Sequence, residues 1–278
     1  MTQALPAPRR SAASFAWPLA DAAVVAKRKL LRIPRTPRML LFATVEPIMF
    51  VLLFSYVLGG AISLPAHEPY RQFLMAGIFA QTLTFSTGSA SVAMAHDLQK
   101  GIIDRFRSLP MARSAVAAGH TIGDVAYNAF ILVIMSAAGL AIGWRTHRGV
   151  VFILAAYGLL LLFGFAMSWI GAYIGMSVPT PEVANTAGYV WLFPLTFISN
   201  AFVPLRTLPG WLQPVAEWNP FSAVVAGARE LFGDADPVGR GGGLPTEHPV
   251  LASLGWSAVL LAVFIPLAIR AYGGAASR

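Results

Sequence analysis

Three polar side chains recur at intervals of four residues within an otherwise apolar stretch: His120, Asp124 and Asn128. In a helix this spacing places them in one stripe along a single face. Ionisable groups arranged in this way could relay protons across a membrane. The same stripe could instead make hydrogen bonds to a neighbouring helix. We favour the second role, because no further His or carboxylate follows deeper in this stretch.

Other polar residues within apolar stretches are candidates for a transport pathway or a gate. Glu46 precedes Pro47 about seven residues into the first apolar stretch. Its carboxylate could control a conduit, or it could pair with a basic group near the membrane interface, as is usual at this modest depth. The remaining pathway or gating candidates are Gln81, Thr84, Thr87 and Asn200.

Small residues recur at helical spacing in two of the apolar stretches. The second stretch carries Thr84, Thr87, Gly88 and Ser91 on one face, and the fourth carries Gly164, Ser168, Gly171 and Gly175. Such spacing is typical of helices that pack closely in a membrane. We expect packing for the fourth stretch, whereas the second could also line a substrate path.

A charged, amphipathic segment, residues 97–113, separates two long apolar runs. Leu98, Ile102, Phe106 and Leu109 recur at helical spacing, and Pro110 disfavours helical geometry at the residue before it. The pattern predicts a helix over 97–109. About 12 helical residues extend only ~18 Å, against ~30 Å for a bilayer core. This helix should therefore lie flat on the membrane or against a partner.

The composition that surrounds these residues indicates an integral membrane protein. Of the 278 residues, 56% are hydrophobic and only 12% are charged, about half the share usual in soluble domains. The net charge of +8 suggests anionic lipid headgroups rather than nucleic acid as the partner, because the basic residues lie beside apolar stretches. The absence of Cys excludes disulfides, thiolate metal sites and cysteine nucleophiles.

Hydropathy predicts an all-α protein with six membrane-spanning helices. Residues 1–38 are expected to form a cytoplasmic tail that contains an interfacial amphipathic helix around residues 19–31. Residues 39–278 are expected to form a single membrane domain. The spans are predicted at 39–63, 71–95, 114–143, 149–176, 186–204 and 250–270.

The distribution of basic residues predicts how these spans are oriented in the membrane. Eight Lys and Arg lie in residues 1–38, four in 96–113 and two from 270 onward, which places 14 of the 20 on one side. The other side holds Arg71, Arg145, Arg148, Arg206, Arg229 and Arg240. The positive-inside rule therefore places both termini and the 97–113 segment in the cytoplasm.

The connection after the fifth span, residues 205–233, is apolar but interrupted by prolines. Its notable residues are Trp211, Asn219, Pro220 and Phe221. Asn219 is a favourable N-cap and Pro220 a favourable first residue, which predicts a helix from Pro220 to about Phe232. Helices this short cannot cross, so we expect a re-entrant pair packed against protein. Asp234 to Pro237, followed by Arg240 to Gly243, should form an exposed flexible loop.

Motifs of soluble enzymes are missing from the sequence. It contains no G-x-x-x-x-G-K-[ST] phosphate loop, no H-E-x-x-H and no G-x-S-x-G. Transport against a gradient would therefore need an external energy source. One alternative is a proton-coupled secondary transporter that uses Glu46 and the His120–Asp124 pair. Another is an intramembrane enzyme acting on lipids, which we disfavour because the carboxylates in the spans do not converge.

Several motifs together resemble the ABC type-2 transporter permeases, especially the daunorubicin-resistance-type branch that exports drugs or lipids. The main one is the run from Lys100 to Ala115. The others are Glu46 to Phe54 with Gly59-Gly60, Phe202 to Leu205, Leu208 to Pro214, Asn219 to Phe221, and Ala228-Arg229. The similarity extends from about Lys29 to Tyr272.

The resemblance implies a permease of the bacterial plasma membrane that forms a homodimer or heterodimer and recruits two separate ATPase subunits. It implies that 97–109 is the coupling helix, and that the first, second and fifth spans line the route or the dimer seam. The ATPase-coupling residues would be Leu98, Gly101, Ile102, Arg105, Phe106, Arg107, Leu109 and Pro110. No cofactor is expected in this chain, since ATP and Mg would bind the partner, and no catalytic or metal-binding residue is expected.

Overall fold

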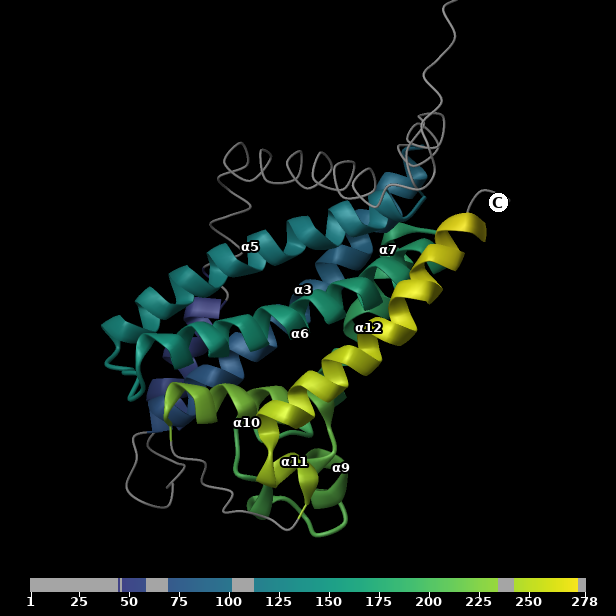
Figure 1. Ribbon diagram of the computed structural model, residues 1–278. Helices are drawn as coiled ribbons and strands as arrows, with labels where there is room; N and C mark the ends of the chain where they lie inside the picture. Colours follow the sequence, from purple (N-terminus) through teal and green to yellow (C-terminus); the bar gives the residue numbers. More distant parts are fainter. Residues whose placement is uncertain (1–44, 46, 59–69, 102–112, 235–242, 275–278) are drawn as a thin grey trace, which may run out of the picture.

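A computed structural model describes residues 45, 47–58, 70–101, 113–234 and 243–274. Regular structure within these ranges is entirely helical, which confirms the predicted all-α class. The long helices are α3 (Tyr70–Gln99), α5 (Arg113–Ala141), α6 (Val150–Ser177) and α12 (Pro249–Gly274). They lie alongside one another in a bundle (Figure 1), with α6 packed against α3, α5 and α12.

Three stretches within the described ranges are long and apolar enough to cross a membrane: Ala117–Ala141, Val150–Ser177 and Pro249–Gly273. The 30 residues of α3 extend about 45 Å, which is also sufficient in length. The bounds of these helices agree within a few residues with the predicted second, third, fourth and sixth spans. The first span is described only in part, as an apolar helix over Pro47–Val57 whose C-terminal part overlaps a π-helical turn, η2 (Phe54–Leu58). The predicted tail at 1–38 lies outside the described residues.

The fifth span differs from the prediction of one helix over 186–204. The chain forms α7 (Pro181–Tyr189), turns, and continues as α8 (Leu192–Phe197), after which residues 198–203 are irregular. The break lies where Pro194 would oppose continuous helix, because it lacks an N–H and its ring crowds the carbonyl four residues earlier, at Val190. The start also moves toward the N-terminus, because Thr180 caps α7 through the Val183 N–H.

The predicted helix after Asn219 is confirmed as α10 (Pro220–Phe232). The Asn219 side chain accepts a hydrogen bond from the Phe221 N–H at 2.8 Å. Before it lie two short elements, η4 (Leu205–Thr207) and α9 (Gln213–Glu217), and α11 (Leu244–Glu247) precedes α12. Helix α10 packs against α3, α6 and α12.

Asp234 does not belong to an exposed loop, contrary to the prediction. Gly233 adopts a left-handed φ of 82°, which turns the chain back so that the Asp234 N–H donates to the Arg229 carbonyl at 3.0 Å. The His147 N–H donates to the Phe232 carbonyl at 2.9 Å. This closure buries the Asp234 side chain, whose Oδ1 lies 3.8 Å from His147 Nδ1. Residues 235–242 lie outside the described ranges.

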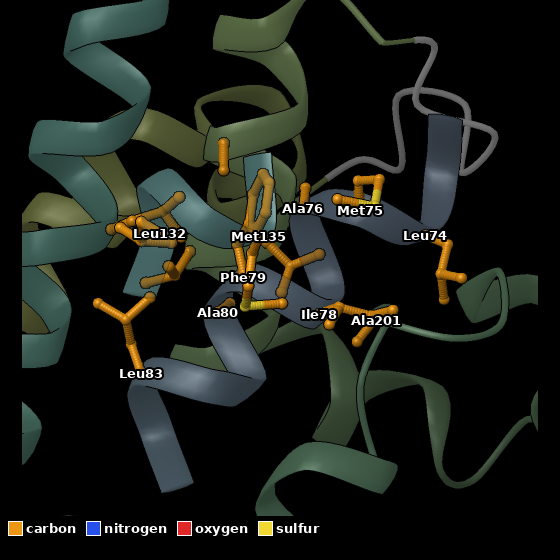
Figure 2. Packing of buried hydrophobic residues seen from close by; sticks show 14 of the residues in the cluster. Leu74, Met75, Ala76, Ile78, Phe79, Ala80, Leu83, Leu132, Met135 and Ala201 are labelled. Atoms are coloured by element: carbon orange, nitrogen blue, oxygen red, sulfur yellow. The ribbon is translucent and has the colours of Figure 1, made fainter. Parts of the chain in front are cut away.

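The main core lies between α3, α5, α6 and α10. Figure 2 shows Phe79 of α3 beside Met135 and Leu132 of α5, with Ala201 nearby. Glycines permit the close approach of α3 and α6: a Cβ on Gly171 would lie 2.5 Å from the Thr87 carbonyl oxygen, and one on Gly175 would overlap the Ser91 carbonyl. The packing role predicted for the small residues of the fourth stretch is therefore confirmed.

Candidate functional site

The candidates predicted to lie on the cytoplasmic side are located where α3 ends and α5 begins. Helix α3 continues through Asp97 and Leu98 to Gln99, and Gly101 then adopts a left-handed φ of 63°. Leu98 therefore belongs to α3, which corrects the predicted single helix over 97–109. The Lys100 and Gly101 N–H groups still bond to carbonyls of the last α3 turn. The other predicted coupling residues lie outside the described ranges: Ile102, Arg105, Phe106, Arg107, Leu109 and Pro110.

A buried acid–imidazole contact joins the two helix ends that flank this segment. His120 Nε2 of α5 lies 3.1 Å from Asp97 Oδ2 of α3, and both side chains are about nine-tenths buried. A carboxylate near a helix C-terminus is electrostatically unfavourable, and burial adds to that cost, so the contact with His120 partly offsets the cost of placing Asp97 there. The contact fixes the spacing of the two ends.

The polar stripe of α5 faces α3. One turn from His120 lies Asp124, which is also buried. Two turns from His120, Asn128 Nδ2 donates to Ser86 Oγ of α3 at 3.2 Å. Polar contacts at both ends of the stripe thus cross to the same helix. This arrangement favours interhelical hydrogen bonding, the role preferred from the sequence.

The pathway candidates of α3 lie within the bundle. Gln81, Thr84 and Thr87 are all buried, and the Thr84 hydroxyl donates to the Ala80 carbonyl of its own helix at 2.7 Å. The face they share with Gly88 and Ser91 packs against α6 and α7, where a Cβ on Gly88 would overlap the Tyr189 ring. In this conformation the face is therefore closed by protein. Glu46 lies outside the described residues.

Asn219 connects two helices at the opposite end of the bundle. Besides capping α10, its Nδ2 donates to the Leu195 and Ile198 carbonyls, each at 2.7 Å, which satisfies the end of α8. Phe221 is fully buried in the main core, whereas Trp211 is 76% exposed. Asn200 is buried, and its N–H donates to Ser222 Oγ of α10 at 3.3 Å. Asn219, Pro220 and Asn200 therefore gather around the start of α10.

Arg229 is a central residue that the sequence analysis named only as an outer-side charge and as part of the Ala228-Arg229 motif. Its side chain is fully buried on α10. Nε donates to the Phe73 carbonyl and NH2 to the Ala201 carbonyl, both at 2.9 Å, and the guanidinium lies 3.5 Å from the Phe73 ring centroid. The nearby Tyr70 hydroxyl donates to the Phe202 carbonyl at 2.9 Å. The available signal was an Arg within a predicted helix whose preceding residues, Ala223 to Ala228, are all small or apolar.

Metal chemistry has no candidate in the described ranges, where no group of three or more His, Cys, Asp or Glu side chains gathers to hold an ion. The polar residues instead connect helices at the two ends of the bundle. Contacts of this kind can hold neighbouring helices in one arrangement and re-form when the helices shift to another, as a protein with two conformations requires.

Comparisons with known proteins agree with this picture. Residues 21–232 match the family described as ABC-2 type transporter. Over 245 residues the chain is 34% identical to the daunorubicin resistance ABC transporter permease protein DrrB1 of Streptomyces coeruleorubidus, an alignment that covers 88% of this chain and 83% of that protein. It is 26% identical over 216 residues to the doxorubicin resistance ABC transporter permease protein DrrB of Mycobacterium tuberculosis, which covers 78% of this chain and 74% of the relative.

Proposed function

This chain belongs to the ABC-2 type transporter family, and we propose that it is the permease subunit of an ATP-driven exporter that moves hydrophobic or amphipathic drugs or lipids across the bacterial plasma membrane. The observation that carries the proposal is the similarity, over most of the chain, to a permease named for daunorubicin resistance. It favours an ABC permease over the proton-coupled transporter considered from the sequence.

ATP hydrolysis belongs, in this proposal, to separate ABC ATPase subunits that bind ATP and Mg. The absence of a phosphate-loop motif from the sequence supports this division. The permease pairs with a second copy or with a related permease, and the assembly recruits the ATPases at the cytoplasmic face.

The proposed topology has six spans with both termini in the cytoplasm. Residues 1–38 form the tail and 39–278 the membrane domain. Two observations support this topology. The C-terminus of α12 lies at the same end of the bundle as the end of α3 and the start of α5 (Figure 1). Arg229, counted among the outer charges, is buried, so it does not add to the charge of the outer surface.

Segment 205–233 is proposed to be re-entrant from the outer side. Helix α10 has 13 residues, about 20 Å, and is buried along nearly its whole length. Protein contacts from α3, α6 and α12 surround it, as non-spanning backbone at membrane depth requires.

Coupling is proposed to pass through the segment between Gly101 and Arg113, with Phe106 and Leu109 filling a pocket on the ATPase and Arg105 and Arg107 pairing with its carboxylates. Closure of the ATPase dimer on ATP would push this segment. Because Asp97 and His120 join the adjoining helix ends, the push would move α3 and α5 together.

The test is Phe106→Asp, in the chain co-expressed with its partner ABC ATPase. A charge in the docking pocket should abolish stimulation of ATPase activity by cargo, while the chain still inserts in the membrane. Trp211→Asp, an exposed aromatic at the opposite end, is the matched control and should leave stimulation intact. Full stimulation of the Phe106→Asp complex would refute the docking assignment.

A further inference from the structure

Three exposed arginines gather at the loop between α5 and α6, which lies at the end of the bundle where α3 begins (Figure 1). Arg145 and Arg148 belong to the loop itself. Arg71 of α3 lies against it, with its Cζ 3.4 Å from the position that a Cβ on Gly143 would take. The backbone N–H of Arg145 donates to the Gln72 side-chain oxygen at 3.2 Å, which joins the loop to the start of α3. We call these three residues the arginine cluster.

Two of the guanidinium groups are held in place by backbone and ring contacts rather than by acids. Nη1 of Arg145 donates to the Leu140 and Trp144 carbonyls at 2.7 and 2.8 Å, which satisfies the end of α5. The Arg148 guanidinium lies 5.1 Å from the centroid of the Phe152 ring. Within the described ranges, no ion pair joins any member of the arginine cluster to a carboxylate. Their charge is therefore available to an external anion.

The surrounding helix ends increase the positive potential of the cluster. Arg71 is the second residue of α3, and Arg148 directly precedes the N-cap residue of α6. Helix N-termini carry a partial positive charge, so a cation there is unfavourable unless an anion accompanies it. The buried acid on the adjoining turn, Asp234, contacts His147 instead of the arginines. An anion bound from outside would offset this accumulation of positive charge.

The loop that carries the cluster lies at the membrane surface. One candidate span ends at Ala141 and the next begins at Val150, so the loop is too short to extend far from the bilayer. The start of α6 is apolar and open: Val150, Val151 and Leu154 are 70%, 78% and 64% exposed. Their spacing places them on one face of the helix, directly below the guanidinium groups. Positive charge thus borders an exposed apolar surface.

The two features together favour one kind of molecule. An acidic soluble protein would meet the charges but could not cover the apolar face of a membrane-spanning helix. A free phosphate ion would likewise leave that face uncovered. A phospholipid meets both, because its phosphate lies at the level of the loop and its acyl chains lie beside the span. Guanidinium groups are also well suited to phosphate, since they can donate two parallel hydrogen bonds to it.

We propose that the arginine cluster binds the phosphate headgroup of an anionic phospholipid, with an acyl chain along the exposed face at the start of α6. The composition suggested anionic headgroups as partners of the basic residues in general, whereas this site lies at the proposed outer end. The lipid is a bound partner rather than the cargo, so the inference goes beyond the proposed function. Its headgroup would bridge the start of α3 and the α5–α6 loop.

The test is native mass spectrometry of the full chain, purified in detergent without ATPase and titrated with dioleoyl-phosphatidylglycerol. The parent should bind this lipid saturably. The double variant Arg71→Gln, Arg148→Gln removes two charges and leaves the carbonyl bonds of Arg145 intact, so it should weaken binding by roughly tenfold or more. The double variant Arg206→Gln, Arg270→Gln removes the same charge from exposed positions elsewhere. This matched control should bind as the parent does.

Four outcomes would overturn the inference. The parent chain could show no saturable binding, or both double variants could bind equally well, which would leave only a general attraction of charge. Glycerol 3-phosphate could displace the lipid at equal concentration, which would assign the cluster to free phosphate. The Arg71→Gln, Arg148→Gln variant could lose the dimer mass, which would assign the cluster to contact with a second copy. Because binding is measured without ATPase or cargo, each can occur while Phe106-dependent coupling survives.

Discussion

The two ends of the bundle are held together by different means. At the proposed outer end, Arg229 bonds to carbonyls of α3 and of the segment after α8, and Asn219 caps α8 and α10 together. The main hydrophobic core extends into this end. At the proposed cytoplasmic end a smaller cluster around Met94, Trp169 and Tyr272 is accompanied by the Asp97–His120 contact.

This difference indicates that the two ends have different roles. Buried hydrogen bonds from one charged side chain to several backbone segments make the outer end costly to open. The cytoplasmic end relies on fewer contacts and borders the proposed docking segment, so it can move at lower cost. We therefore expect outer-end substitutions to affect stability most, and cytoplasmic-end substitutions to affect coupling most.

The largest expected effect is that of Arg229→Ala. It removes donors from two buried carbonyls and leaves a cavity, which should lower the free energy of unfolding by about 3–5 kcal/mol. Unfolding in mixed detergent and SDS micelles measures the loss. Arg206→Ala, at an exposed position, is the control and should change stability by less than about 0.5 kcal/mol. Equal stabilities for the two variants would contradict the claim that the buried contacts of Arg229 stabilise the outer end.

An intermediate effect is expected from Gly175→Ala in α6. The added Cβ overlaps the Ser91 carbonyl of α3, so the helices must separate, at a cost of about 1–3 kcal/mol. Gly158→Ala lies on the same helix with nothing within 4 Å of the added Cβ. Helix propensity alone should then stabilise this control by roughly 0.5–1 kcal/mol. Thermal unfolding of both variants gives the comparison, and a stabilised Gly175→Ala variant would argue against close α3–α6 packing.

The smallest effect on stability is expected at the cytoplasmic end. A double-mutant cycle with Asp97→Asn and His120→Gln should give a coupling energy of about 1–2 kcal/mol. Each single variant should nevertheless reduce cargo-stimulated ATPase activity by more than Arg206→Ala does, because the pair joins the helix ends beside the docking segment. If the stability changes of the two single variants simply add and ATPase stimulation stays normal, the proposed difference between the two ends is wrong.

Much of the helical framework follows from the sequence. Long apolar runs bounded by charge, Pro or Gly gave helix bounds correct within a few residues, and Asn219-Pro220 identified the start of α10. Local signals sufficed in these cases because capping and hydropathy act over a few neighbouring residues. The stripe of small residues in α6 predicted close packing for the same reason.

Tertiary contacts account for what the sequence did not reveal. Pro194 was included in an apolar run of spanning length, although a helix continued from α7 could not accommodate it, and the chain breaks just before α8. Arg229 was counted only as a charge on the outer side, and its buried contacts were not predicted because its carbonyl partners at Phe73 and Ala201 are distant along the chain. Asp234 was assigned to a loop, whereas the turn at Gly233 buries it.

The central claim is that ATP hydrolysis in a partner subunit drives transport by this chain. Uptake of doxorubicin into inverted membrane vesicles, with and without the co-expressed ATPase, tests it most directly. The account predicts uptake that requires both the ATPase and ATP, persists with a protonophore, and is lost in the Phe106→Asp variant. Uptake by vesicles that contain this chain alone, driven by a proton gradient and abolished by the protonophore, would contradict it.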